Sequence, residues 1–318
     1  MPPPPPISGI RIGELLGEGT SGTVYAAVNK DGDEIAVKFL RESLVDDPEM
    51  VVRFKREASV AQKLRSEFIA QVVSAGRSGD HYWIAYRRLH GETLARRMTR
   101  EGALEPAALL PLVEQVLRGL GVAHEAGVIH RDIKPANIMI ERLERARKGP
   151  TERACIMDFG ISKSPTGSSG TFQHSLTSAT ATLGTINYMP PEQVGGSAGV
   201  DHRADLYSVG VVAYRALSGR LPYWGSSQAL VMHAKLNEDA RPLAVATGAK
   251  WPLTVEAFFE QSLAREPCGR FANATAMATA WRLALEGTAM PAVKALRGGS
   301  GDSEEGGDTM PEGPGSTR

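Results

Sequence analysis

Hydrophobic and polar positions follow one pattern up to about residue 86 and another beyond it. From Ile10 to Tyr86, short segments rich in β-branched and aromatic residues alternate with polar turns, which is typical of antiparallel strands. The predicted strands are Gly22–Ala27, Glu34–Leu40, Gln71–Ala75 and His81–Tyr86. One helix interrupts them, because apolar residues recur at helical spacing after the start signal Asp47-Pro48-Glu49.

From Leu94 onward helical spacing dominates. The predicted helices are Pro106–Ala126, Ala204–Leu217, Ser227–Leu236, Val255–Ala264 and Ala274–Leu285. The pattern therefore predicts an α+β protein of two lobes. A small β-rich lobe with one helix spans residues 10–86, and a larger, mainly helical lobe spans residues 87–287.

The two ends differ in composition from the middle of the chain. Residues 1–9 begin with Met1 and five prolines, which suit neither a helix nor a sheet. We expect this segment to be disordered, with a ligand for an aromatic groove as the alternative. Residues 288–318 are rich in Gly, Ser, Pro and acidic residues and are expected to form a disordered tail.

Composition and charge exclude several classes of protein. Lys and Arg together number 36, as do Asp and Glu, so the formal net charge is +0, which argues against a nucleic-acid binder. Cys155 and Cys268 are the only two cysteines, too few for a disulfide scaffold or a zinc cluster. The apolar runs are too short for a membrane span, and the N-terminus lacks the features of a signal peptide. We expect a cytoplasmic protein with no membrane or nucleic-acid partner.

A glycine-rich turn provides the first candidate for chemistry. The segment Gly17-Glu18-Gly19-Thr20-Ser21-Gly22-Thr23-Val24 has the spacing GxGxxGxV. In a dinucleotide-binding fold the third glycine opens a helix, whereas strand-forming residues follow here. The segment therefore favours a hairpin whose backbone N–H groups close over phosphates.

Lys38 ends the apolar stretch Ile35-Ala36-Val37 and is a candidate for binding phosphate oxygens. Glu57, in the predicted helix, is placed to form an ion pair with it. The sequence leaves two other interpretations open: Lys38 faces solvent, or Glu57 pairs with Arg53 one turn away.

Two further segments have the residues that phosphoryl transfer to a hydroxyl requires. They are His130-Arg131-Asp132-Ile133-Lys134-Pro135-Ala136-Asn137 and Asp158-Phe159-Gly160. Asp132 can accept the hydroxyl proton, and Lys134 can neutralise charge on the transferred phosphoryl group. Asn137 and Asp158 can hold Mg²⁺ on the phosphates.

From Ile10 to Leu285 the chain resembles the eukaryotic-like (Hanks-type) serine/threonine protein kinases in these motifs and in several later landmarks. The later landmarks are Gly184-Thr185, Tyr188-Met189-Pro190-Pro191-Glu192, Asp205-Leu206-Tyr207-Ser208-Val209-Gly210 and Pro267-Cys268-Gly269-Arg270-Phe271. The resemblance implies the bilobal protein kinase fold and transfer of the ATP γ-phosphate to Ser or Thr hydroxyls of proteins, with Mg²⁺ or Mn²⁺.

The resemblance also implies roles for individual residues. The catalytic set would be Asp132, Lys134, Asn137, Lys38 and Glu57, and the metal ligands Asn137 and Asp158. The ATP site would comprise Gly17, Glu18, Gly19, Gly22, Val24, Ala36, Lys38, Arg87, Leu89, Met139 and Asp158. Of these, Val24, Ala36 and Met139 would enclose adenine. Glu192 would pair with buried Arg270, Asp205 would brace the backbone of residues 130–132, and Thr185 would lie beside Asp132 and Lys134.

Three departures from the family pattern stand out. The usual Ala-Pro-Glu is Pro190-Pro191-Glu192. The segment between the lobes is Tyr86-Arg87-Arg88-Leu89, in which Tyr86 would narrow the space behind adenine while backbone groups still read the base. Residues 141–153 are longer than a tight hairpin needs, and we expect a solvated loop, with docking of an acidic partner as the alternative.

Residues 162–185 contain twelve Ser and Thr among 24 residues, where the resemblance places an activation segment. A phosphate on Thr177, Ser178, Thr180 or Thr182 could reach Arg131 and order this segment. We therefore expect autophosphorylation there, through self-association. Two alternatives to a protein kinase remain, a pseudokinase scaffold and a small-molecule kinase of the aminoglycoside or choline type.

Overall fold

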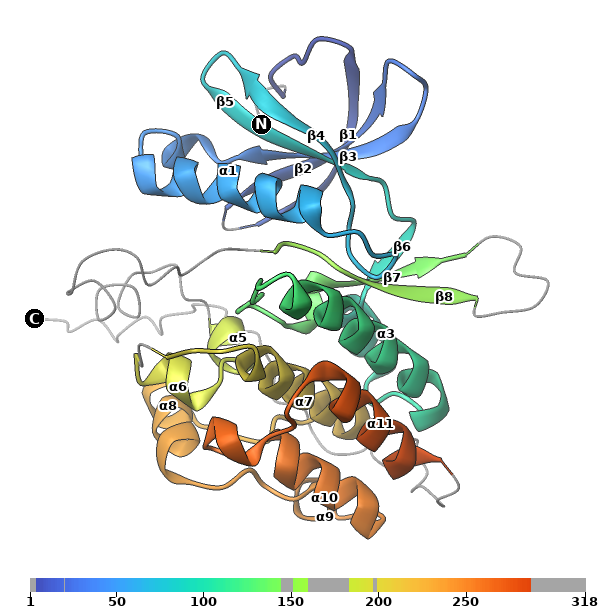
Figure 1. The fold of residues 1–318 in the computed structure, drawn as a ribbon, viewed down its shortest axis with the longest axis vertical. Helices are drawn as coiled ribbons and strands as arrows, with labels where there is room; N and C mark the ends of the chain where they lie inside the picture. The colour runs from blue at the N-terminus through green and yellow to red at the C-terminus, as the bar shows by residue number, and fades with distance from the viewer. Residues whose placement is uncertain (1–3, 20, 144–150, 160–182, 197–198, 287–318) are drawn as a thin grey trace, which may run out of the picture.

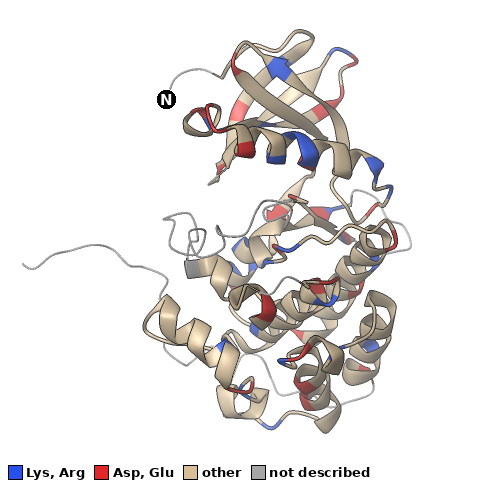
Figure 2. Cartoon of the chain, turned by 60° about the vertical axis from the view of Figure 1, so that its left-hand side comes forward, with Lys and Arg blue, Asp and Glu red and all other residues tan. Residues whose placement is uncertain are grey.

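The computed structural model describes residues 4–19, 21–143, 151–159, 183–196 and 199–286. Within these ranges the chain forms two lobes, one above the other in Figure 1. The upper lobe is a β-sheet with one long helix across it, and the lower lobe is mainly helical. Positions of Lys and Arg (blue) and of Asp and Glu (red) occur in both lobes (Figure 2), in keeping with the balanced net charge.

The upper lobe has a five-stranded sheet in the order β1-β2-β3-β5-β4, with the pairs antiparallel. Its strands are β1 (Ile10–Glu18), β2 (Gly22–Asn29), β3 (Glu34–Leu40), β4 (Val72–Ser78) and β5 (His81–Arg87). Gly32 and Gly79, both with positive φ, lie in the turns predicted between β2 and β3 and between β4 and β5.

The two faces of this sheet bury different apolar clusters. On one face Tyr25, Val37, Phe39 and neighbouring side chains pack together with Ile7. Ile7 is 8% exposed and pairs with Ile10, so the expectation that the disordered N-terminal segment extends to residue 9 is wrong at this position. The burial of a large apolar side chain on the sheet provides the physical reason.

Helix α1 (Pro48–Lys63) covers the other face of the sheet. It begins where the sequence predicts, because the Asp47 side chain accepts hydrogen bonds from the backbone N–H groups of Glu49 and Met50 and Pro48 occupies the first turn. Val51, Phe54 and Ala58 face the sheet and pack against Leu40 and Ile84. This packing fixes which face of α1 points inward, and Glu57 lies on that face.

A single large core holds the lower lobe together. Its longer helices are α2 (Leu94–Glu101), α3 (Pro106–Glu125), α7 (Arg203–Ser218), α8 (Gln228–Asn237), α10 (Leu253–Ser262) and α11 (Ala274–Leu285). Two one-turn helices, α5 (Leu183–Ile186) and α6 (Pro191–Val194), and α9 (Leu243–Thr247) complete it. Helix α7 is buried on nearly all sides and packs against α3, α9 and α10.

A small three-stranded sheet, in the order β6-β7-β8, lies on the side of the lower lobe that faces the upper lobe. Its strands are β6 (Gly91–Thr93), β7 (Ile138–Arg142) and β8 (Glu152–Ile156). The expected solvated loop over residues 141–153 is therefore wrong at both ends. Glu141 is 5% exposed because two arginines surround its carboxylate, as described below.

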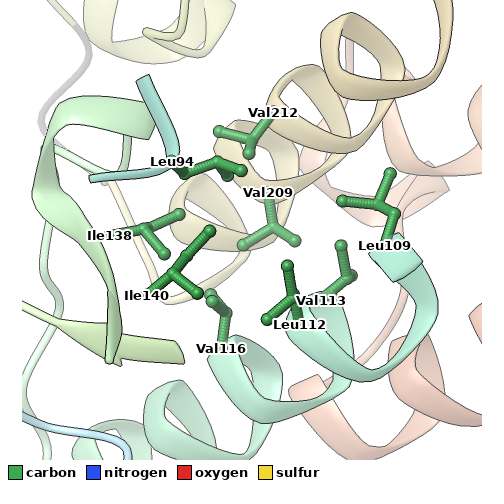
Figure 3. Close-up of a pocket in the computed structure, with 9 residues that line it drawn as sticks. All are labelled: Leu94, Leu109, Leu112, Val113, Val116, Ile138, Ile140, Val209 and Val212. Carbon is green, nitrogen blue, oxygen red and sulfur yellow. The ribbon is translucent and has the colours of Figure 1, made fainter. Parts of the chain in front are cut away.

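A small apolar cavity lies in the lower-lobe core, between α3, α7 and the three-stranded sheet (Figure 3). Its lining is aliphatic: Leu94, Leu109, Leu112, Val113, Val116, Ile138, Ile140, Val209 and Val212. In the described part of the chain, no helix combines the length with the apolar character that crossing a membrane requires. Both cysteines are free thiols, Cys155 buried and Cys268 exposed.

Candidate active site

The central contact of the site joins three elements that are distant in sequence. The Lys38 ammonium, on β3, lies 2.9 Å from Oε1 of Glu57 on α1 and 2.7 Å from Oδ1 of Asp158, which follows β8. The predicted Lys38–Glu57 ion pair is confirmed, and the alternatives of a solvent-facing Lys38 and a Glu57–Arg53 pair are wrong. Arg53 pairs instead with Glu49.

The charges of this triad stabilise one another. Burial opposes the charge on Lys38, but the carboxylates of Asp158 and Glu57 outweigh it and raise the pKa of the ammonium above its ordinary value. Desolvation likewise opposes ionisation of Asp158, while Lys38 holds the pKa of that carboxyl below its ordinary value. Lys38 is therefore a fixed cation, and Asp158 a fixed anion, at neutral pH.

The glycine-rich turn joins β1 to β2, as expected. Of the three glycines in this turn, only Gly22 is required by contacts within the protein, because a Cβ there would come within 1.9 Å of the backbone oxygen of Phe39. A Cβ on Gly17 would meet nothing within 4 Å, so space remains open above this strand. Glu18, also expected at the ATP site, accepts a hydrogen bond from Arg41, whose guanidinium also donates to the carbonyl oxygen of Gly19. Arg41 was not predicted as a site residue, and its position directly after β3 is the only sequence signal for it.

The loop of residues 130–132 is held from below by Asp205 of α7. The buried carboxylate of Asp205 accepts the backbone N–H groups of His130 at 2.8 Å and Arg131 at 2.7 Å. It also contacts Nε2 of His124 at 2.8 Å. Arg131 has a φ of 64°, a strained conformation that these hydrogen bonds stabilise. The predicted bracing role of Asp205 is confirmed.

Asp132, Lys134, Asn137 and Thr185 converge next to this loop. The Lys134 ammonium lies 2.9 Å from Oδ2 of Asp132 and donates to the Thr185 hydroxyl at 3.1 Å. The Asn137 amide donates to the same Asp132 oxygen at 3.0 Å and to the Asp132 carbonyl at 2.8 Å. The Asp132 carboxylate is thus oriented by two donors, and its side chain remains 23% exposed.

The oxygen donors at Asn137 and Asp158 suit a magnesium ion that is held mainly by phosphates. The amide nitrogen of Asn137 donates to Asp132, and the Asp158 side chain is 43% exposed. Asn137 and Asp158 are also brought together by the pairing of Ile138 with Ile156 and by the hydrogen bond from Met157 N to Asn137 O. Among the described residues, no group of three or more His, Cys, Asp or Glu could hold a metal ion by itself.

The residues expected around adenine come from both lobes. Val24 pairs with Lys38, and Ala36 with Tyr86, so both lie on the sheet face that carries Lys38. Met139 lies on β7 and pairs with Thr93. Arg87 ends β5, and Leu89 follows in the segment between the lobes, which places these backbone groups at the junction.

The Arg87 side chain forms an ion pair with Glu141, so it is not placed to bind a nucleotide. It forms two hydrogen bonds with the Glu141 carboxylate, at 2.7 and 3.1 Å, and Arg153 binds the same carboxylate at 2.8 Å. The link joins the end of the upper sheet to β7 and β8 of the lower lobe. The sequence does not predict this link, because the pairing depends on how the two lobes meet.

Glu192 and Arg270 form the expected pair, with two parallel hydrogen bonds of 2.7 and 2.8 Å. The proposed phosphorylation sites, Thr177, Ser178, Thr180 and Thr182, lie outside the described residues.

This geometry agrees with comparison to known proteins. The sequence matches the protein kinase domain family over residues 10–282. The chain belongs to this family.

Bacterial serine/threonine-protein kinases are among its relatives. It is 36% identical over 269 residues to serine/threonine-protein kinase pkn3 of Myxococcus xanthus, a match covering 84% of this chain and 48% of that protein. It is 33% identical over 272 residues to serine/threonine-protein kinase PknB of Mycobacterium tuberculosis, a match covering 84% of this chain and 41% of that protein. The chain thus spans less than half the length of these relatives.

The crystal structure of the Mycobacterium tuberculosis PknI kinase domain has the same fold. Its TM-score is 0.66 at 24% sequence identity, over 87% of this chain and 96% of that one. The predicted bilobal protein kinase fold is confirmed.

Proposed function

We propose that the chain is an active serine/threonine protein kinase that transfers the ATP γ-phosphate to protein hydroxyls. The observation that carries the proposal is the bridge from Lys38 to both Glu57 and Asp158. It supports an active enzyme rather than a pseudokinase, because the cation for the phosphates and the metal-binding carboxylate are both held in place.

Each residue then has a definite task. Lys38, kept in position by Glu57, binds phosphate oxygens of ATP, and the backbone at Gly17, Glu18, Gly19 and Gly22 covers them. Val24, Ala36 and Met139 enclose adenine, and the backbone at Arg87 and Leu89 reads its edge. Asn137 and Asp158 would hold Mg²⁺, which neutralises phosphate charge when bound.

Asp132 accepts the proton of the attacking hydroxyl. Its Oδ2 forms an ion pair with Lys134 and accepts a hydrogen bond from Asn137, so the orientation of the carboxylate is fixed. The Lys134 ammonium stabilises the charge that develops on the transferred phosphoryl group. Its contact with the Thr185 hydroxyl supports Ser or Thr, rather than Tyr, as the acceptor.

Regulation by autophosphorylation within residues 177–182 is part of the proposal, with a second copy of the chain as the substrate. The backbone of Arg131 is fixed by Asp205, and its side chain would bind the phosphate group of the phosphorylated residue. The cytoplasmic location suggested by the cysteine content also belongs to the proposal. Mass spectrometry of fully active protein should find this segment phosphorylated, and an unmodified segment would refute this part.

The main test is transfer of radiolabelled phosphate from ATP to a generic basic protein. The wild-type chain should label it, and Asp132→Asn should reduce kcat by about 100-fold or more, because the general base is lost. Wild-type rates in Asp132→Asn would overturn the assignment of the base. Nucleotide binding without transfer would indicate a pseudokinase, and transfer only to aminoglycosides or choline would indicate a small-molecule kinase.

A further inference from the structure

Tyr86 and Lys38 project from the same face of the upper sheet. In the antiparallel pairing of β3 with β5, Lys38 lies opposite Ile84 and Ala36 opposite Tyr86. Because side chains alternate along a strand, Tyr86 shares a face with Lys38, one diagonal position away. That face packs against α1, with Ile84 in the cluster beneath the helix.

The Tyr86 hydroxyl donates a hydrogen bond to Oε1 of Glu57 at 2.8 Å. The same oxygen accepts the Lys38 ammonium at 2.9 Å. Burial of the hydroxyl and the negative charge of Glu57 raise the pKa of Tyr86 well above its ordinary value. The phenol therefore stays protonated and remains a donor throughout the physiological pH range.

We infer that Tyr86 is a positioning residue for phosphoryl transfer, whose hydroxyl keeps the Glu57 carboxylate turned toward Lys38. The inference rests on the proposed function, because the Lys38–Glu57 pair matters catalytically only if Lys38 binds phosphates. Tyr86 touches neither the acceptor hydroxyl nor the general base, and it acts through Glu57 alone.

The hydrogen bond from Tyr86 to Glu57 matters because the Lys38–Glu57 ion pair does not by itself fix the position of α1. Asp158 also pairs with Lys38, at the shorter distance of 2.7 Å, so Lys38 would remain paired if α1 moved away. Tyr86 adds a bond from β5 to α1 that depends on neither Lys38 nor Asp158. A charge-assisted hydrogen bond of this kind biases α1 toward the position in which the triad is complete.

Four variants test this role: Tyr86→Phe, Glu57→Ala, the double variant, and Tyr82→Phe as the matched control. Tyr86→Phe removes the hydroxyl and keeps the ring. Tyr82 lies on the same strand, but its ring lies beneath Lys55 and Arg77 instead of contacting Glu57. With radiolabelled ATP and a generic basic protein, Tyr86→Phe should lower kcat/KM for ATP by about 3- to 10-fold. Tyr82→Phe should match the wild type.

The double variant separates positioning from packing. If Tyr86 acts through Glu57, adding Tyr86→Phe to Glu57→Ala should change kcat/KM by less than about twofold. An equal loss in both backgrounds would assign the effect to packing and overturn the inference, as would wild-type activity of Tyr86→Phe.

Hydrogen exchange of the α1 amides provides a readout that is independent of catalysis. Exchange around Glu57 should be faster in Tyr86→Phe than in the wild type and unchanged in Tyr82→Phe. Equal exchange in all three proteins would overturn the inference. An inactive wild type with faster α1 exchange in Tyr86→Phe would instead refute the proposed function and retain the structural role of Tyr86.

Discussion

Arg270 and Glu192 form a buried bidentate ion pair between the segment that follows α10 and the start of α6. The Arg270 side chain is 0% exposed, and its guanidinium also donates to the carbonyl oxygens of Ala264 and Arg265. The pair therefore joins α6 to the segment that follows α10.

Replacing Arg270 with Ala should destabilise the protein by about 3–5 kcal/mol, because the Glu192 carboxylate is left buried without its partner. Urea unfolding measures the change. Asp239→Asn is the control, since Asp239 is 99% exposed in its pair with Arg265 and should contribute less than about 1 kcal/mol. Equal effects of the two substitutions would contradict the buried pair.

The Glu141→Gln variant should lose stability at neutral pH, by about 1–3 kcal/mol, because Arg87 and Arg153 lose their shared carboxylate. Burial favours the neutral acid, but hydrogen bonds from both arginines hold the pKa of Glu141 below its ordinary value of 4.5. The stabilisation is therefore complete above that value and is lost as the pH falls through the lowered pKa.

Urea unfolding of wild type and Glu141→Gln from about pH 7 down to 3 should show the difference shrinking in acid. A difference that is constant over this range would show that the charge of Glu141 is not what holds the junction together.

Unlike the charge on Glu141, the charge on the buried Lys235 of α8 destabilises the fold. Its ammonium contacts the Tyr207 hydroxyl at 3.4 Å and lies over the rings of Tyr207 and Tyr223. Burial lowers the pKa of Lys235 from 10.5 to about 7; the charge of nearby Arg270 adds to this, and Glu192 opposes it only in part. Between these values the unfolded chain binds a proton that the folded chain does not, so stability rises with pH.

Lys235→Met should therefore be more stable than the wild type at pH 7, by about 1–4 kcal/mol. The advantage should narrow toward pH 10, where the unfolded lysine also begins to lose its proton. Thermal unfolding over this range measures it, with the exposed Lys250→Met as the control. If the difference in stability between the wild type and Lys235→Met does not change with pH, the burial of the Lys235 ammonium is contradicted.

Leu112→Ala should cost about 2–5 kcal/mol in unfolding free energy, near the upper end, because the removed methyl groups would enlarge a cavity that already exists. Leu283→Ala is the matched control, since Leu283 is 67% exposed on α11 and its truncation should change stability by less than about 1 kcal/mol. Urea midpoints that shift equally in both variants would be incompatible with the core described here.

The sequence predicted the long elements well, because they depend on local signals. The Asp47 cap, the turn glycines and the helical spacing of apolar residues are readable within a few residues, and α11 begins and ends where expected. Strand β1 and helix α2 were not among the predicted elements. Strands β6, β7 and β8 were missed because they are short and gain their stability from one another. We expected residues 141–153 to form a loop because charged residues dominate them, whereas the pairing of Glu141 with both Arg87 and Arg153 explains why this carboxylate is buried.

The sequence by itself determined which chemical groups are present: a lysine, an amide and acids in the order and spacing of a protein kinase. The tertiary structure alone decided which of them meet. Lys38 could have faced solvent, and Glu57 could have paired along its helix. The packing of α1 on the sheet and the approach of β8 bring both carboxylates to one ammonium, 19 and 120 residues away. The Tyr86 and Arg87 contacts depend on the tertiary structure in the same way, because the packing of the strands and lobes sets the positions of these side chains and of their partners.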